Sequence, residues 1–150
     1  MQLEDNSKQY VIVELNIQNA KKAIKFYEKA LGAEIIEVLT GEKLPINNPY
    51  SLILRNKIIH AKLNFKGTLI FISDKITPSA NEKCSEVRCN RSTVSVCLSL
   101  DSEWEFERLF YNLAADGEIT MPISNQYWGA KLGIVEDNFG VTWTLSYKHP

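Results

Sequence analysis

The feature that most constrains the fold of this chain is a repeat of its architecture. The order of strand, capped helix, glycine and strand occurs twice at a nearly constant offset, and the two helices end at Gly32 and Gly117. Few side chains are identical between the copies, so what repeats is the hydrophobic period and the turn residues. This pattern predicts two modules of similar topology.

Each copy of the repeat contains four segments with the period of a strand. The predicted strands are residues 10–17, 33–39, 58–65 and 68–73 in the first copy and 93–100, a strand that begins at 118–121, 130–136 and 141–147 in the second. Lys66-Gly67 is expected to form a hairpin turn, and residues 40–55, which contain two prolines, are expected to form an excursion loop.

A capped amphipathic helix follows the first strand of each copy. Asn19 provides the first N-cap, and Ser102 with Glu105 forms the capping box of the second helix. Helical spacing of apolar residues predicts a buried stripe on both helices, and Trp104 is expected to pack as well. The residues of the stripes are Ala20, Ala23, Ile24, Tyr27 and Leu31 in the first helix and Phe106, Leu109, Phe110 and Leu113 in the second.

These elements predict an α+β fold in which two βαβββ modules pair into a curved, partly open mixed sheet with the helices outside. We expect one domain over residues 1–150. It consists of module one over 10–73, a linker over 74–92 and module two over 93–148.

The net charge, the length of the apolar runs and the absence of nucleotide-binding motifs argue against several classes of protein. The net charge is −1, which offers no electrostatic drive toward nucleic acid or an anionic membrane. Apolar runs are too short to span a bilayer, and residues 1–9 lack the apolar region of a signal peptide, so we expect a cytoplasmic location. No glycine-rich nucleotide motif is present, so no nucleotide cofactor is predicted.

The three cysteines, Cys84, Cys89 and Cys97, do not form a disulfide framework or a zinc set. Their number is odd, and the spacing of Cys84 and Cys89 is not that of a CxxC pair. Cys84 and Cys89 are therefore expected to be free thiols in the linker.

The strand face that is turned away from the helices is expected to be mixed in character. It carries polar, charged and apolar side chains together, which suits the lining of a ligand pocket, and a solvated sheet face is the alternative. The predicted members are Tyr10, Ile12, Glu14, Asn16, His60, Lys62, Asn64, Leu69, Phe71, Ser73, Thr93, Ser95, Cys97, Ser99, Thr142, Thr144 and Ser146.

Three segments resemble the vicinal oxygen chelate superfamily, which includes glyoxalases, bleomycin-resistance proteins and dioxygenases. They are residues 19–35 (NAKKAIKFYEKALGAEI), 58–74 and 119–145. The Tyr-Trp-Gly step at 127–129 and the Asp-x-Phe-Gly-x-x-Trp turn at 137–143 are similar to its PhnB-like branch, which often carries a demethylubiquinone methyltransferase-like label. The resemblance implies a glyoxalase/bleomycin-resistance-like fold, and no methyltransferase motif accompanies it.

The resemblance also implies where a catalytic metal would be held. The superfamily binds a divalent metal through side chains on four strands, and those positions correspond here to Ile12, Phe71, Ser95 and Thr144. Two of these are hydrocarbon and two are weakly coordinating hydroxyls, so we expect no metal of the glyoxalase kind. The four positions coincide with the face that strand parity assigns to the pocket.

Several residues have two possible roles. Glu14, His60 and Cys97 would form a displaced metal site only if their strands met, and otherwise Glu14 and His60 are hydrogen-bonded strand residues. Trp128 would close the pocket mouth or stack on a planar ligand, contact a second chain, or simply pack. Trp143 has core parity, and His149 at the C-terminus is expected to have no function.

The first functional hypothesis is a protein that binds a small molecule without metal, through Glu14, His60, Phe71, Ser95, Trp128 and Thr144. A lyase or dioxygenase relative with a displaced metal site is the second, and an interaction module without a pocket is the third. Whether any reaction is catalysed is left open. A homodimer is expected from the resemblance.

Overall fold

The computed structural model describes residues 9–49, 51–75 and 93–148. The chain divides into two compact units, Met1–Asp74 and Lys75–Pro150, and each unit is described by itself. Among the described residues, no helix is both long and apolar enough to cross a membrane.

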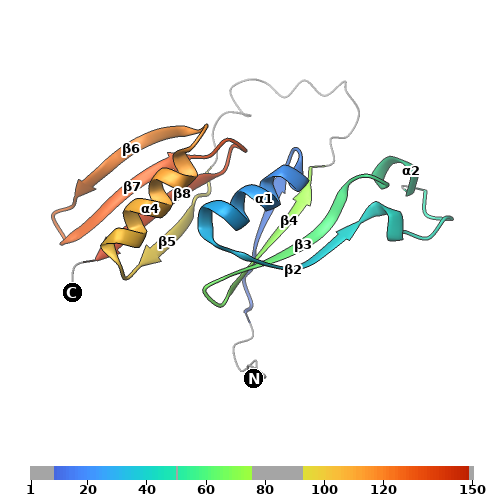
Figure 1. Cartoon of the computed structure of the whole chain (residues 1–150), viewed down its shortest axis with the longest axis horizontal. Helices are drawn as coiled ribbons and strands as arrows, with labels where there is room; N and C mark the ends of the chain where they lie inside the picture. Colours follow the sequence, from blue (N-terminus) through green and yellow to red (C-terminus); the bar gives the residue numbers. More distant parts are fainter. Residues whose placement is uncertain (1–8, 50, 76–92, 149–150) are drawn as a thin grey trace. The chain divides into compact units, whose positions relative to one another are not determined.

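Unit 1 is a four-stranded mixed sheet with a helix on one face (Figure 1). Its elements are β1 (Val13–Ile17), α1 (Ala20–Leu31), β2 (Glu34–Thr40), η1 (Gly41–Lys43), α2 (Ser51–Leu54), β3 (Ile58–Phe65) and β4 (Thr68–Asp74). The strand order is β1-β4-β3-β2. β1 and β4 are parallel, because α1 carries the chain across the sheet, and the other pairs are antiparallel.

Asn19 and Asp74 fix the beginning of α1. The Asn19 side chain, in the left-handed region at φ 66°, accepts a hydrogen bond from the Lys22 amide. The Asp74 carboxylate accepts bonds from the Ala20 amide (2.9 Å) and from the Ile58 amide (2.6 Å). One carboxylate at the end of β4 therefore ties the helix to the first residue of β3, and the buried stripe of α1 lies on the sheet.

The connection from β2 to β3 is an excursion from the sheet, and its two ends are joined by a hydrogen bond at its base. Figure 1 shows this segment, with α2 near its tip, extending away from α1. At the base the Gly41 amide donates to the Lys57 carbonyl over 3.0 Å. A Cβ on Gly41 would lie only 1.7 Å from the Leu54 carbonyl oxygen, so this crossing of two backbones requires glycine.

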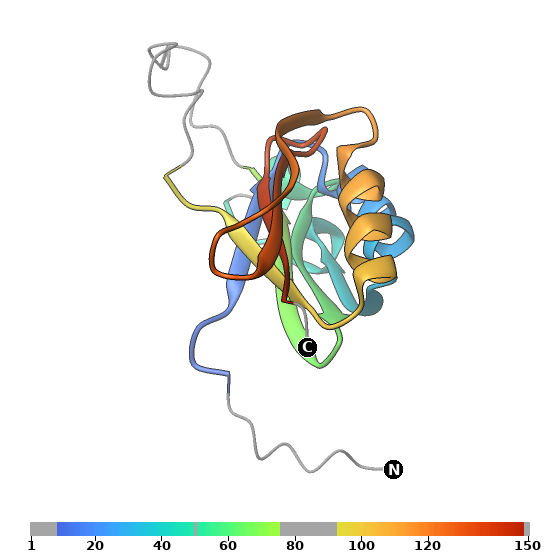
Figure 2. The ribbon, with the colours of Figure 1, turned by 90° about the vertical axis from the view of Figure 1, so that its left-hand side faces the viewer.

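Unit 2 repeats the topology of unit 1. Its elements are β5 (Val96–Leu100), α4 (Glu103–Ala114), β6 (Glu118–Asn125), β7 (Ala130–Glu136) and β8 (Thr142–Lys148), in the order β5-β8-β7-β6. Ser102 caps α4 by accepting from the Glu105 amide. Figure 2 shows α4 on one side of this sheet only. The helix lies close, since a Cβ on Gly133 would be 2.5 Å from the buried Phe110 ring.

Asp137 organises the turn between β7 and β8. Its carboxylate is buried and accepts hydrogen bonds from the amides of Phe139 and Val141 and from the indole nitrogen of Trp143, at 2.8 to 3.0 Å. Three donors satisfy the charge in a site with little water. The Asp-x-Phe-Gly-x-x-Trp motif therefore has a structural role, and the prediction that Trp143 is a core residue is confirmed.

The α+β fold class with two βαβββ modules is confirmed, whereas several details of the elements were predicted wrongly. β1 and β5 begin later than predicted, and Val11 (81% exposed) and Val94 (72%) lie outside the core. The Gln9 side chain, rather than a strand backbone, bonds the amide and carbonyl of Leu69, so the ladder starts only at Val13.

Three further differences concern single segments. Trp104 is 71% exposed and does not pack in the core. It lies on the solvent face of α4, where Arg108 covers its ring at 4.8 Å. β6 extends to Asn125 and includes Pro122, which an edge strand tolerates. The excursion is not wholly a loop, because it contains η1 and α2. Cys84, Cys89, His149 and most of the predicted linker lie outside the described residues.

Candidate functional site

The face of the first sheet that is turned away from α1 carries three of the predicted site residues. Glu14 on β1 pairs in register with Phe71 on β4, so their side chains are neighbours on one face. The His60 ring from β3 lies edge-on to the Phe71 ring, with centroids 4.6 Å apart and planes at 78°. The structure thus brings an acid, an imidazole and an aromatic ring together.

A second polar group surrounds Ser73 on the same face. The Ser73 hydroxyl lies 2.8 Å from Asn16 Oδ1 and 3.4 Å from Glu14 Oε1, and both oxygens can accept its single proton. Ser73 is buried although its two partners are exposed. The nearer Asn16 oxygen is the better acceptor of this proton, and the exposed Glu14 carboxylate lies beside the hydroxyl on the same face.

The polar region of this face ends at the edge strand β2 with an ion pair. Lys62 Nζ on β3 lies 3.2 Å from the Glu37 carboxylate on β2, and both side chains are partly exposed. The pair supplies one charge of each sign next to Phe71, since Lys62 is the register partner of Phe71. Its contribution to stability is small because water screens it.

The corresponding face of the second sheet carries hydroxyls rather than charges. Thr144 Oγ1 on β8 donates to Ser95 Oγ over 3.3 Å, so the two predicted site residues of this sheet do meet. Cys97 on β5 is the register partner of Thr144 and is an exposed free thiol. Further hydroxyls, of Ser99, Thr142 and Ser146, lie on the same face.

Trp128 lies at the tip of the hairpin between β6 and β7. The Gly129 amide bonds the Gln126 carbonyl over 3.1 Å, and Gly129 adopts φ 89°, which closes a tight turn. Trp128 is 52% exposed and lies edge-on to Tyr127, which is 98% exposed. Neither ring belongs to the core of unit 2, so ordinary packing does not explain them.

The predicted site thus consists of two half-sites. Glu14, His60 and Phe71 are grouped in unit 1, and Ser95 is grouped with Thr144 in unit 2. Ile12 lies two residues before Glu14 in the segment that precedes β1 and is half-buried. That both half-sites line one cavity remains a prediction.

Sequence reasoning placed Asn16, Ser73 and Lys62 on the pocket face but did not select them as site residues, and it did not identify Glu37. Strand parity was the available signal for the first three. The pairing of Glu37 with Lys62 depends on a register shift between Ile35 and Glu37, which parity does not reveal.

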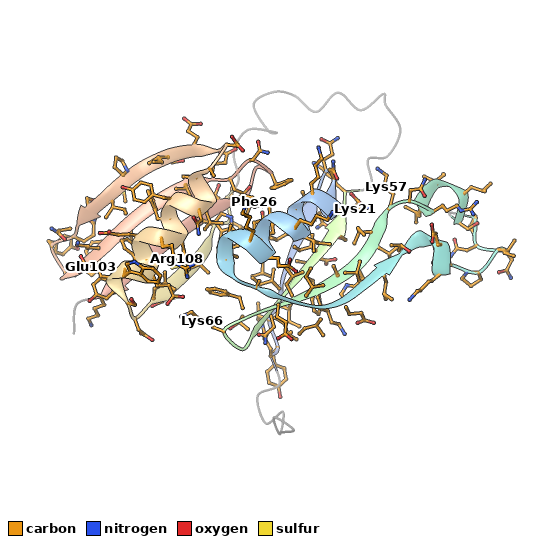
Figure 3. The ribbon with its side chains drawn as sticks, in the orientation of Figure 1. Lys21, Phe26, Lys57, Lys66, Glu103 and Arg108 are labelled. Atoms are coloured by element: carbon orange, nitrogen blue, oxygen red, sulfur yellow. The ribbon has the colours of Figure 1, made fainter. Side chains whose placement is uncertain are left out.

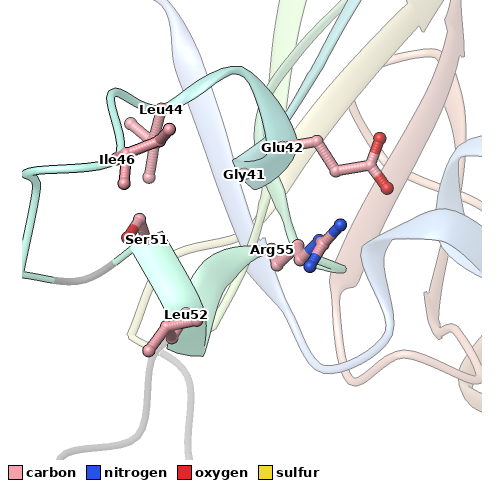
Figure 4. A pocket seen from close by; sticks show the side chains of 7 residues that line it. All are labelled: Gly41, Glu42, Leu44, Ile46, Ser51, Leu52 and Arg55. Carbon is pink, nitrogen blue, oxygen red and sulfur yellow. The ribbon is translucent and has the colours of Figure 1, made fainter.

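Two hollows lie elsewhere on unit 1, along the excursion. One, of about 460 Å³, is lined by Leu44 and Ile46 on one side and by Ser51 and Leu52 on the other, as Figure 4 shows. The other, of about 500 Å³, lies between α1 and β2. Neither includes a predicted site residue.

The geometry and the sequence together define a member of a known class. Residues 9–145 match the model of the glyoxalase/bleomycin resistance protein/dioxygenase superfamily, and the chain belongs to this superfamily. The family resemblance predicted from the sequence is therefore confirmed. The chain is 31% identical to protein YjdN of Escherichia coli over 138 residues, which covers 85% of this chain and 87% of that protein.

Solved structures agree on the fold. Protein PA1353 from Pseudomonas aeruginosa superposes with a TM-score of 0.76 at 26% identity, covering 95% of this chain and all of that one. A PhnB protein from Bacillus cereus, titled a putative 3-demethylubiquinone-9 3-methyltransferase, gives 0.69 at 24% identity, covering 93% of this chain and 99% of that chain.

The side chains at the four positions that the resemblance assigns to metal ligands do not suit a divalent cation. Ile12 and Phe71 offer no donor atom, and the hydroxyls of Ser95 and Thr144 bond each other. Divalent metals in proteins take imidazole, carboxylate or thiolate ligands in sets of three or more. Among the described residues, no three such side chains are grouped in a way that could hold a metal.

Proposed function

We propose that this protein binds a small organic molecule on the sheet faces that carry the two half-sites, without the superfamily's catalytic metal. The proposal is supported by the character of the four positions that the resemblance assigns to metal ligands, since two are hydrocarbon and two are weakly coordinating hydroxyls. The surrounding face carries polar and aromatic groups suited to recognition. The proposal extends to a homodimer as the binding unit, with the compartment being cytoplasmic.

Each residue has a distinct expected contact. Glu14 supplies a carboxylate acceptor, and His60 supplies a ring nitrogen that donates or accepts. Phe71 supplies apolar surface beside the imidazole, and Ser95 with Thr144 supplies hydroxyls. Trp128 supplies a stacking surface at the end of its hairpin. Such a lining suits a ligand that has a planar apolar part and a few polar groups.

A thermal-shift screen of small molecules, run with and without a chelator, tests the proposal. A ligand at a hundredfold excess over its dissociation constant stabilises the folded state by about 2.7 kcal/mol. We expect shifts that the chelator does not change and that decrease in His60→Ala and Thr144→Val. Lys29→Gln, an exposed change on α1, is the matched control and should keep every shift.

Metal analysis of the purified protein could contradict the proposal of metal-free binding. Stoichiometric zinc, nickel, manganese or iron that is lost in Glu14→Ala or His60→Ala would replace this proposal by an enzyme with a displaced metal site. An absence of any ligand-induced shift, together with shifts caused by a protein partner, would favour the interaction module.

A further inference from the structure

The hollow of about 500 Å³ in unit 1 lies on the opposite face of the sheet from the half-site. Its wall strand β2 contributes Val38, which pairs in register with the buried Ala61 beneath α1. Glu37, the preceding residue, reaches Lys62 on the other face. Because successive strand residues point to opposite faces, this hollow is separate from the region around Glu14 and His60.

The floor of the hollow is apolar. Ile24 of α1 and Ile58 of β3 are buried, and Ile35 and Val38 of β2 continue the surface outward. α1 covers the middle of the sheet and leaves the edge strand β2 partly uncovered, so the side chains of Ile35 and Val38 are open to a ligand from one side. An apolar ligand body that covers them would be removed from water.

The rim of the hollow is cationic. Lys21 and Lys25 of α1 and Arg55 after α2 line it, against one carboxylate, Glu42. Within the part of the chain that the structure describes, none of these three cations lies within ion-pair distance of a carboxylate. Figure 3 labels Lys21 in the first turn of α1. The chain as a whole has a net charge of −1, so this concentration of positive charge is local.

Lys21 is placed against the helix dipole. It lies in the first turn of α1, which has no acidic residue of its own, and positive charge is unfavourable at a helix N-terminus. The backbone donors there are already used, since the Ala20 amide bonds Asp74 and the Lys22 amide bonds Asn19. The Asp74 carboxylate supplies negative charge at this helix end, so a bound anion would contact the rim cations and not the backbone of α1.

Backbone hydrogen bonds hold the base of the excursion, which carries Arg55, in place. The Gly41 amide bonds the Lys57 carbonyl, and the Lys57 amide bonds the Leu54 carbonyl over 2.9 Å. The backbone of Gly41 lies against the Leu54 carbonyl so closely that no side chain fits at this position. Arg55 is therefore presented opposite α1 by a backbone that needs no rearrangement, which favours binding.

From this floor and rim we propose that the hollow between α1 and β2 binds a small amphiphilic anion, a carboxylate with an apolar body. The apolar body covers Ile35 and Val38, and the carboxylate is held by Lys25 and Arg55 with Lys21 nearby. This is a second binding site, and its existence does not depend on the proposed function of the opposite face.

Titration of the full chain with octanoate, followed by amide NMR, tests the proposal. We expect the largest shifts at Val38, Thr40, Gly41 and Arg55, and smaller ones at Phe71 and Thr144. 1-Octanol, which has the same chain length without the charge, is expected to bind more weakly. Affinity for octanoate should fall as salt is raised, because the rim cations are exposed.

Charge-removing variants locate the carboxylate. Lys25→Gln and Arg55→Gln are each expected to weaken octanoate binding about two- to fivefold, the range for exposed ion pairs. The double variant should approach the affinity for 1-octanol. Lys29→Gln removes a charge from the same helix outside the hollow and should leave binding unchanged, and a retained amide spectrum shows that each variant is folded.

Three results would overturn the proposal. One is equal affinity for octanoate and 1-octanol, which would mean that the rim cations do not contribute to binding the carboxylate. Another is octanoate shifts confined to residues of the opposite face, such as Phe71 and His60. The third is a Lys29→Gln variant that weakens binding as much as Lys25→Gln, which would show a non-specific effect of net charge.

Discussion

The two units share a skeleton but carry different chemistry on corresponding positions. Counting back from the helix caps at Asn19 and Ser102, Glu14 corresponds to Cys97, and the strand registers then match Phe71 with Thr144 and Lys62 with Ile134. The face in unit 1 has ionisable side chains, and that in unit 2 has hydroxyls, a thiol and hydrocarbon. Repetition of the fold thus preserves backbone pairing and leaves the recognition groups free to differ.

The buried sides of the two units agree more closely. The positions under the helices, Ala61 in unit 1 and Gly133 in unit 2, correspond by register and are both small. Phe110 occupies the space above Gly133. Helix-on-sheet packing constrains residue size at this point, whereas the outer face has no such constraint.

The largest expected effect concerns the carboxylates that anchor each unit. Asp137→Ala removes the hydrogen bonds that its buried carboxylate accepts from the Phe139 and Val141 amides and from the Trp143 indole, so we expect a loss of about 3 kcal/mol in the free energy of unfolding. Asp74→Ala, with two backbone donors in a half-buried site, should cost about half as much. Denaturant titration measures both, and equal losses would remove this difference between the units.

The small residues under the helices give the next test. Gly133→Ala places a methyl group against the Phe110 ring and is expected to destabilise by about 2 kcal/mol. Ala61→Gly loosens the backbone of β3 and should cost about 1 kcal/mol. In Gly133→Ala/Phe110→Leu the combined loss should be smaller than the sum of the single losses, because the clash is relieved. Additive losses would contradict the contact.

Corresponding serines on the outer faces of the two units are expected to differ by a smaller amount in unfolding free energy. Ser73→Ala removes the hydroxyl shared by Asn16 and Glu14 and is expected to cost about 1 kcal/mol. Ser146→Ala changes the corresponding residue of unit 2, for which no side-chain hydrogen bond is found among the described residues, and should be nearly neutral. A larger loss for Ser146→Ala would reverse the assignment of the polar cluster to unit 1.

The smallest effect is a pH dependence in unit 2. The hydrogen bond from Lys131 to Glu103 raises the pKa of Lys131 above 10.5. A raised pKa stabilises the fold below the unfolded value of 10.5, and this stabilisation is lost as pH rises through the higher folded value. The difference in unfolding free energy between the wild type and Lys131→Met should therefore be present at pH 8 and decrease as the pH rises above 10.5 and through the raised pKa of Lys131 in the folded state. A difference that does not decrease would contradict the pairing.

The sequence alone predicted the elements whose signals are local. Asn19, Gly32 and Ser102 mark the helix ends by chemistry that acts within one turn, and the predicted first helix matches α1. Lys66-Gly67 forms a turn with positive φ at both residues, as a two-residue hairpin requires.

The details that depend on distant residues were not predictable. The late start of β1 reflects Gln9 bonding Leu69, a contact between residues far apart in sequence. The ring pair of His60 and Phe71 requires the register of β3 on β4. Parity placed both rings on one face but could not give their separation. The hollow between α1 and β2 arises from incomplete covering of the sheet, for which the sequence has no periodic signal.

The closed base of the excursion makes the segment after Gly41 a replaceable part. The Gly41 amide bonds the Lys57 carbonyl where the excursion joins the sheet. We therefore expect the pairing of β2 with β3 to be independent of the residues that the excursion contains. Unit 2 makes the same connection with the short turn at Gln126 and Gly129. Grafting that turn between β2 and β3 would yield a shorter protein with an intact core, and a longer graft would add a new appendage at the same junction.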